Sequence, residues 1–214
     1  MIDINKNLSK DRTSDAQDFV VANTLNNLGN IAALAGDLNA SVDFYRQALQ
    51  DLRQKSCSDK DIADVLFNLG RIQLQKQEFD TSMSNLIEAS RMIKKLYSPK
   101  NILLAHTLAL IGIVHMSTKS PEAALISFLE AHEIYLALLG EVHKDVASSW
   151  YHIGLAQEAK EVYKDAWESF TSARDIFTRL GIDQGDPGLK KVRRSISRAE
   201  QLIAQKNKPN NNSS

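Results

Sequence analysis

The sequence predicts an all-α fold in which four helix-turn-helix repeats stack into a solenoid. The pair Leu28-Gly29 recurs at a regular spacing as Leu69-Gly70, Ile111-Gly112 and Ile153-Gly154. The glycines are separated by 41, 42 and 42 residues. The apolar residues follow a helical period, and capping residues and prolines fall between the apolar segments. An internal period of this length is typical of a repeat array.

Other positions recur at fixed offsets from each glycine, and their residue types indicate how the two helices of a repeat pack. Small residues are needed where helices approach closely, and a large residue must fill the gap beside them. The small residue twelve positions after the glycine is Ser41, Ser82, Ala124 or Ala166, and the alanine nineteen positions after it is Ala48, Ala89, Ala131 or Ala173. The large residue sixteen positions after it is Tyr45, Leu86, Phe128 or Phe170, and the one four positions before it is Leu25, Leu66, Leu108 or Trp150.

The apolar periodicity predicts two helices in each repeat. The first helices are expected near 16–35, 61–76, 101–118 and 145–160, and their partners near 38–55, 79–96, 121–139 and 163–180. Asp61, Asn101, Asp145 and Asp186 are expected to cap the helices that follow them, and Ser120-Pro121 should begin a second helix. These elements divide the chain into repeats at about 14–60, 61–100, 101–144 and 145–186. Residues 1–13 are expected to be disordered or loosely ordered, and the polar tail 207–214 is expected to be disordered.

The pattern resembles the tetratricopeptide repeat, in which an aromatic residue, Leu-Gly, Ala, Phe and Ala follow one another at this spacing. The fourth repeat matches best, through Trp150, Ile153-Gly154, Ala166, Phe170 and Ala173. The usual period is shorter, and the period of 42, together with the segment 139–147, resembles the extended repeats of kinesin light chain. The resemblance covers about residues 22–181 and implies a right-handed superhelix that binds other proteins. HEAT and armadillo arrays have similar periods but lack the glycine-to-alanine spacing.

A further helix is predicted at 187–206, where Leu189, Val192, Ile196, Ala199 and Ile203 form an apolar stripe. The end of a repeat array needs a cover, so a capping helix is the first interpretation. Charge gives a second interpretation. Residues 187–214 hold seven Lys or Arg and one acid, Glu200, which gives a net charge of +6. A basic amphipathic helix can also attach to lipid or nucleic acid.

Composition gives no overall reason to bind nucleic acid or a membrane, because 26 basic residues balance 26 acidic ones. The single cysteine, Cys57, fits a reducing compartment. The N-terminus does not resemble a secretory signal, and the apolar segment 102–116 is too short to span a bilayer. A cytoplasmic location is therefore expected.

No sequence pattern indicates catalysis, a metal site or a cofactor. The glycines do not form a phosphate-binding loop, and the histidines are not at ligand spacings. Cys57 has only Lys55 and Lys60 as basic neighbours, so an ordinary loop cysteine is the simpler interpretation. The sequence therefore predicts no enzyme activity and no small-molecule substrate.

Solenoids of this kind place their first helices on the concave side, where a partner segment binds. Asn23, Asn26, Asn27 and Asn30 share one stripe of the first helix, and asparagine can bind a peptide backbone through its amide. Equivalent positions add Asp64, Phe67, Asn68 and Arg71, then His106, Leu110 and Ile113, and then Tyr151, His152 and Leu155. The predicted groove is polar in its first half and apolar or aromatic in its second.

This groove is predicted to bind an extended peptide with an apolar anchor. A basic clamp for a C-terminal carboxylate, as in co-chaperone domains of this family, is not expected. Asn30 and Asn68 match that clamp, but Asn26, His106 and Leu110 replace its charged residues. A regulatory sensor of a short signalling peptide remains the alternative use of the groove, and attachment through the basic helix remains the alternative partner class.

Overall fold

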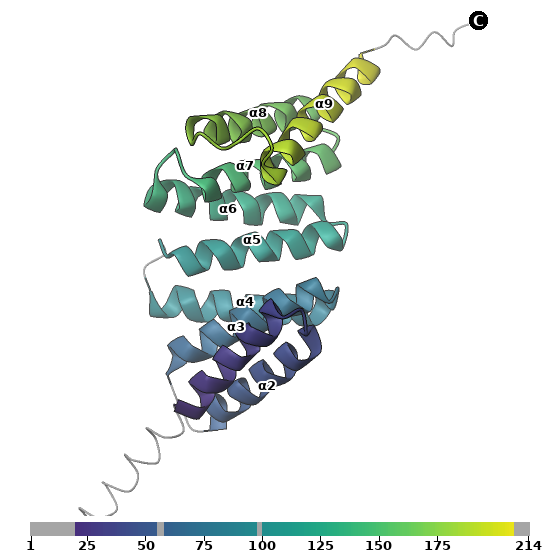
Figure 1. Ribbon diagram of the computed structural model, residues 1–214. Coiled ribbons are helices and arrows are strands. Elements are labelled where there is room, and N and C mark those ends of the chain that lie inside the picture. The colour runs from purple at the N-terminus through teal and green to yellow at the C-terminus, as the bar shows by residue number, and fades with distance from the viewer. Residues whose placement is uncertain (1–19, 55–57, 98–99, 208–214) are drawn as a thin grey trace, which may run out of the picture. The chain divides into compact units, whose positions relative to one another are not determined.

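The computed structural model describes residues 20–54, 58–97 and 100–207. The segment 1–13, Cys57 and the tail beyond residue 207 lie outside these residues. The described part is helical and contains no strand. After a helix at 20–34 come α2 (Leu38–Gln54), α3 (Asp59–Gln75), α4 (Phe79–Leu96), α5 (Ile102–Ser117), α6 (Pro121–Leu139), α7 (Lys144–Ala159), α8 (Tyr163–Arg179) and α9 (Pro187–Lys206), labelled in Figure 1. Each helix matches a predicted one within a few residues.

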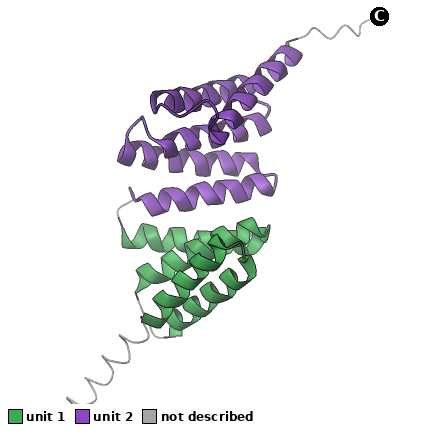
Figure 2. Ribbon diagram, in the orientation of Figure 1, with its two compact units in different colours: residues 1–99 green, residues 100–214 purple. Residues whose placement is uncertain are grey.

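The chain forms two compact units, coloured separately in Figure 2. Unit 1 comprises residues 1–99 and unit 2 comprises residues 100–214, so the division falls at the predicted boundary between the second and third repeats. In unit 1, α3 packs against both α2 and α4. In unit 2, each helix from α5 to α9 packs against the next. This sequential packing of helix neighbours confirms the all-α solenoid class.

The predicted register of the repeats is confirmed, because every repeat glycine faces the large residue sixteen positions later. A Cβ on Gly154 would lie 2.6 Å from the Phe170 ring, and one on Gly70 would lie 2.7 Å from Leu86. Only glycine permits this approach without displacement of the neighbouring side chain. The predicted large residues Tyr45, Leu86, Phe128 and Phe170 and the alanines Ala48, Ala89, Ala131 and Ala173 are all at most 1% exposed.

The serines in the first two repeats have a second use. Ser41 Oγ donates a hydrogen bond of 2.8 Å to the carbonyl of Gly29, and Ser82 Oγ donates one of 2.7 Å to the carbonyl of Gly70. Each serine is therefore small enough for the two helices to approach closely at this point, and its buried hydroxyl has a hydrogen-bond partner.

Two predicted helix caps are wrong. Ser58, rather than Asp61, caps α3, and its side chain accepts a hydrogen bond from the Lys60 amide. His143, rather than Asp145, caps α7, and its Nδ1 accepts a 3.1 Å hydrogen bond from the Asp145 amide. Both aspartates lie instead in the first turn, where the helix dipole favours a negative charge.

The other predicted caps are confirmed in position. Asn101 Oδ1 accepts from the amides of Leu103 and Leu104 at 2.8 and 3.3 Å, and Asp186 Oδ1 accepts from the Leu189 amide at 3.0 Å. Ser120 occupies the cap of α6 ahead of Pro121, but its side chain makes no capping hydrogen bond.

The turn between the two helices of each repeat contains one residue with left-handed backbone, at positions again 41 or 42 apart. In the first repeat this residue is Gly36, with φ of 83°. In the others it is Gln77, Lys119 and Glu161, with φ of 62°, 58° and 61°. Residues with a side chain rarely adopt this conformation, so the same turn geometry recurs without the glycine that would signal it.

The C-terminal helix α9 packs against α8 and buries the predicted stripe. Leu189, Val192, Ile196 and Ala199 are between 0 and 7% exposed, and Ile203 is half-buried. This is the predicted capping helix.

Polar contacts hold α9 along its length. Arg198 Nε lies 2.7 Å from the Glu158 carboxylate, and Trp167 Nε1 donates a 3.1 Å hydrogen bond to Glu200. Lys206 Nζ donates to the Glu161 carbonyl at 3.2 Å. Exposed pairs of this kind stabilise little individually, but they fix the orientation of the helix on α7 and α8.

Candidate functional site

The first helix of the fourth repeat, α7, presents two opposite sides, and its predicted site residues share one of them. Tyr151, His152 and Ser148 project to one side, whereas Val146 and Trp150 project to the other, as the helical period requires. A cavity of about 230 Å³ lies on the first side, between α7, α8 and α9. We call it the α7–α9 pocket. It is lined by Lys144, Ser148, Tyr151, His152, Phe177, Gly188, Lys191 and Val192.

Ring contacts hold Tyr151 and His152 in this pocket. The His152 ring stacks on Phe128, with centroids 5.2 Å apart, and the Tyr151 ring lies 5.8 Å from Phe170. Phe128 and Phe170 are the residues that pack on the repeat glycines, so the site is built directly on the buried repeat motif. The positions of Tyr151 and His152 therefore follow from the core and are set before any ligand binds.

The charge of the pocket is positive. Lys144 and Lys191 are exposed and line it, and none of its lining residues is acidic. The pKa of His152 is lowered, chiefly by burial and also by the charge of Lys191, although a backbone hydrogen bond at Ser148 opposes the shift. His152 is therefore neutral near pH 7, and the two lysines carry the charge of the site.

A smaller cavity of about 50 Å³ adjoins the same side of α7, where α5 and α6 approach it. Ser148 and His152 line both cavities. Nearby, His106 Nε2 lies 3.8 Å from the Asp145 carboxylate, and the His106 ring lies 5.5 Å from the Tyr135 ring. These contacts join the first helices of the third and fourth repeats into one surface within unit 2.

The asparagine stripe of unit 1 is also joined to the next repeat. Asn68 Nδ2 donates a 3.2 Å hydrogen bond to Asn26 Oδ1, which links the first helices of the first two repeats. Asn30 Oδ1 accepts a 2.7 Å hydrogen bond from the Tyr45 hydroxyl. Part of the amide hydrogen-bonding capacity that the sequence assigned to a ligand is therefore used within the unit. At Asp64, in the same unit, burial raises the pKa of the carboxyl, and the charge of Lys60 opposes this shift.

All but one of the predicted groove residues share one level of exposure. Asn27 is exposed, and the following residues are half-buried: Asn23, Asn26, Asn30, Asp64, Phe67, Asn68, Arg71, His106, Leu110, Ile113, Tyr151, His152 and Leu155. Ile113 packs against the buried cluster that contains Phe128 and Ile153, so part of its surface belongs to the core.

Sequence reasoning missed the part of the α7–α9 pocket that α8 and α9 contribute. Phe177, Gly188, Lys191 and Val192 were not expected at a site, because the repeat pattern assigns binding to the first helices of the repeats. A signal was available in the adjacent Lys190 and Lys191 at the start of an amphipathic helix.

Among residues 20–54, 58–97 and 100–207, no three His, Cys, Asp or Glu side chains gather as metal ligands would. Within the same ranges, none of the helices combines the length and the apolarity that crossing a bilayer demands.

Comparison with known proteins supports the fold. The tetratricopeptide repeat family model matches residues 20–95. The sequence has no match among curated proteins. The crystal structure of BtubC (BKLC) from P. vanneervenii is similar over 100% of this chain and 97% of that chain, with a TM-score of 0.68 and 16% identity.

Two further solved structures are similar. A kinesin light chain-type protein of Podosopora anserina with nearly identical TPR-like repeats has a TM-score of 0.73 and 14% identity, over 86% of each chain. The apo form of RapI has a TM-score of 0.70 and 19% identity, over 83% of this chain and 47% of that chain.

The chain is an all-α repeat protein with a positive, partly aromatic pocket between α7, α8 and α9. Residues 20–95 match the tetratricopeptide repeat family model, and the described chain shares its fold with kinesin light chain-type repeat proteins. Repeats of this family are generally protein-interaction modules and scaffolds rather than enzymes.

Proposed function

We propose that this protein is an interaction module that binds an extended segment of a partner protein along the first helices of its repeats. An apolar side chain of the segment enters the α7–α9 pocket. The observation that supports this proposal most is the composition of that pocket, which combines Tyr151, Phe177 and Val192 with two lysines and contains no acid. Sites for peptide anchors are typically concave and mostly apolar, with a few polar groups that orient the ligand.

The two lysines indicate what should flank the anchor. Lys144 begins α7 and Lys191 lies in the first turns of α9, so positive charge lies on both helices that form the pocket. A partner segment with Asp or Glu next to a bulky apolar residue would satisfy both features at once. Charge complementarity of this kind favours the correct partner and accelerates its association.

The first helices of unit 1 are proposed to bind the backbone of the partner segment rather than its side chains. Asn27 is exposed, and Asn23 is half-buried beside it on the same stripe. An amide side chain can donate to a carbonyl and accept from an N–H of an extended peptide. This surface would hold a segment with little preference for its side chains.

A charge-reversal experiment tests the proposal. Peptides selected from a random library on the full chain should be enriched in an acidic residue adjacent to a large apolar one. Lys144→Glu with Lys191→Glu should weaken the binding of these peptides at least tenfold, measured by calorimetry, because two attractions become repulsions.

The matched control is Lys190→Glu with Arg193→Glu, which changes the net charge equally. Lys190 and Arg193 are exposed on α9 and do not line the pocket. Peptide binding should change less than threefold in this variant. An equal loss of peptide affinity in both variants would show that the effect depends on overall charge, and the assignment of the peptide anchor to the α7–α9 pocket would lose its support.

A further inference from the structure

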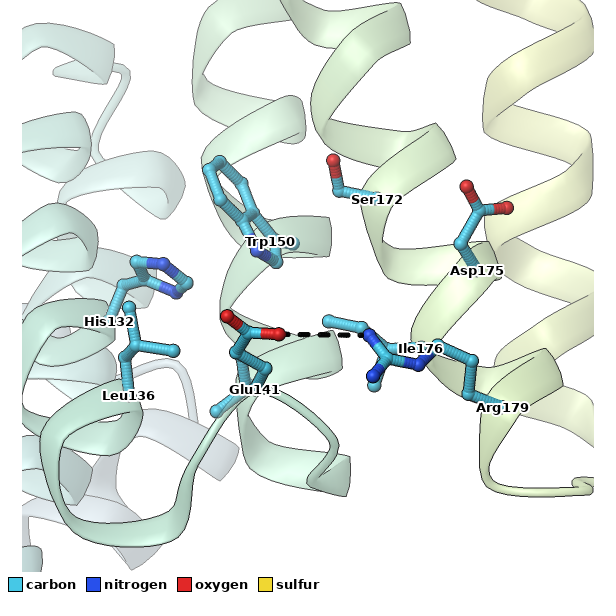
Figure 3. Close-up of a pocket in the computed structure, with 9 residues that line it drawn as sticks. His132, Leu136, Glu141, Trp150, Ser172, Asp175, Ile176 and Arg179 are labelled. Atoms are coloured by element: carbon cyan, nitrogen blue, oxygen red, sulfur yellow. Dashed lines mark ion pairs between the residues drawn. The ribbon is translucent and has the colours of Figure 1, made fainter.

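A larger cavity lies on the opposite side of α7. It has a volume of about 360 Å³ and is formed by α6, α7, α8 and the segment between α6 and α7 (Figure 3). We call it the outer pocket. Val146 and Trp150 of α7 line it, and neither lines the α7–α9 pocket. The two cavities are therefore separate, and what binds in one does not depend on the function proposed for the other.

A buried histidine at the outer pocket has a fixed tautomer. His132 is 7% exposed, and its Nδ1 lies 2.8 Å from Ser149 Oγ. Ser149 Oγ donates its single proton to the Val146 carbonyl at 2.8 Å. The hydrogen between the two side chains must therefore come from His132 Nδ1, which leaves Nε2 with a lone pair.

That lone pair has no hydrogen-bond partner in the described part of the chain. The His132 ring points toward Trp150 (Figure 3), and the two rings have centroids 4.4 Å apart. Burial lowers the pKa of His132, so the ring is neutral and Nε2 remains an acceptor. This acceptor is open to the cavity, so a ligand that covered it without donating a hydrogen bond would leave it unpaired, which is costly. A ligand that donates a hydrogen bond avoids this cost.

The other lining residues determine which kind of side chain fits in the cavity. Leu136, Trp150 and Ile176 provide apolar walls, and Leu136 is 40% exposed toward the opening. The charges at the rim are paired. Glu141 Oε2 lies 3.9 Å from Arg179 Nη1, the ion pair that Figure 3 marks, and Asp175 Oδ1 lies 2.7 Å from Arg174 Nη2. A lysine or arginine guest would therefore have to compete with an existing cation for each carboxylate.

We propose that the outer pocket binds a tyrosine side chain of a protein partner. Its ring lies between Leu136, Trp150 and Ile176, and its hydroxyl donates a hydrogen bond to His132 Nε2. Phenylalanine would fill the same walls but would leave the acceptor unpaired. A tyrosine combines an apolar ring with one hydrogen-bond donor at its end. The ring complements the apolar walls of this cavity, and the donor complements the Nε2 acceptor of His132.

The test uses p-cresol, the side-chain analogue of tyrosine, with the full chain. The chain contains two tryptophans, so its NMR spectrum has two indole N–H signals, and Trp167→Phe assigns the signal of Trp150. Titration with p-cresol should shift the Trp150 signal to saturation. Toluene, which has no hydroxyl, should bind roughly fivefold more weakly, as the loss of one hydrogen bond predicts.

Two variants refine the test. His132→Phe should bind p-cresol and toluene equally. Leu136→Phe, at a half-exposed position, should weaken both by narrowing the opening. The comparison of the two probes on the unmodified chain decides the matter even if the histidine variant fails to fold.

Other results would overturn the proposal. These are toluene binding as tightly as p-cresol, a shift of the Trp167 signal alone, and tighter binding of n-butylamine, which would assign the pocket to lysine. Tighter binding of 3-methylindole would assign it to tryptophan instead.

Discussion

A chain that ends at Asp186 should melt at a lower temperature than the full chain and should self-associate. This truncation removes α9, whose Leu189 and Val192 are at most 1% exposed against α8. Full burial of each such side chain stabilises by about 1.5–3 kcal/mol as an upper estimate, so the total loss should be several kcal/mol. Phe177, which is 5% exposed, would also lose its cover. Thermal unfolding and analytical ultracentrifugation measure the two effects.

Removal of residues 208–214 alone serves as the control and should change neither property. A monomeric protein of unchanged melting temperature after the longer truncation would show that α9 is an appendage. The capping interpretation would then fail, and attachment to lipid or nucleic acid through the basic helix would become the better explanation of its charge.

Gly112→Leu should be the most destabilising single substitution in the repeat motif of unit 2. A Cβ at this position would lie 2.6 Å from Phe128 Cδ1, and Phe128 is only 1% exposed, so its ring has no free space to enter. Overpacking of a core by this amount costs about 1–3 kcal/mol or more. Thermal unfolding of the variant measures the loss.

Ala137→Leu provides the comparison, because Ala137 is exposed on α6 and the added atoms project into solvent. This variant should melt close to the unmodified protein. If Gly112→Leu also did so, the glycine would not be at a helix contact, and the register of the repeats would have to be reassigned.

The register could be predicted from sequence because it depends on pairs of residues at a fixed separation. Gly154 and Phe170 contact one another across two adjacent helices, and the distance between them along the chain is set by one helical pair. The same dependence recurs four times, so no single position decides it. The helix caps lack this redundancy. Several polar residues stand together at the start of α3, and Asp61 can stabilise the helix from its first turn without capping it.

Two other features could not be predicted, for different reasons. The left-handed residues Gln77, Lys119 and Glu161 carry no local signal, because the turn is imposed by the packing of the helices on either side. The α7–α9 pocket depends on the rotation of α9 about its own axis, since Lys191 and Val192 line the cavity only in the observed orientation. An apolar stripe predicts which side of a helix is buried, but not which neighbour the edges of that stripe contact.

The most direct measurement of the central claim is an NMR map of where a selected peptide binds on the full chain. Amide signals of isotopically labelled protein would be followed during titration with one peptide from the library. The largest shifts should occur at Ser148 and Tyr151 of α7 and at Val192 of α9, which line the α7–α9 pocket. The largest shifts at Trp150 and Ile176, on the opposite side of α7, would contradict the assignment of peptide binding to this surface.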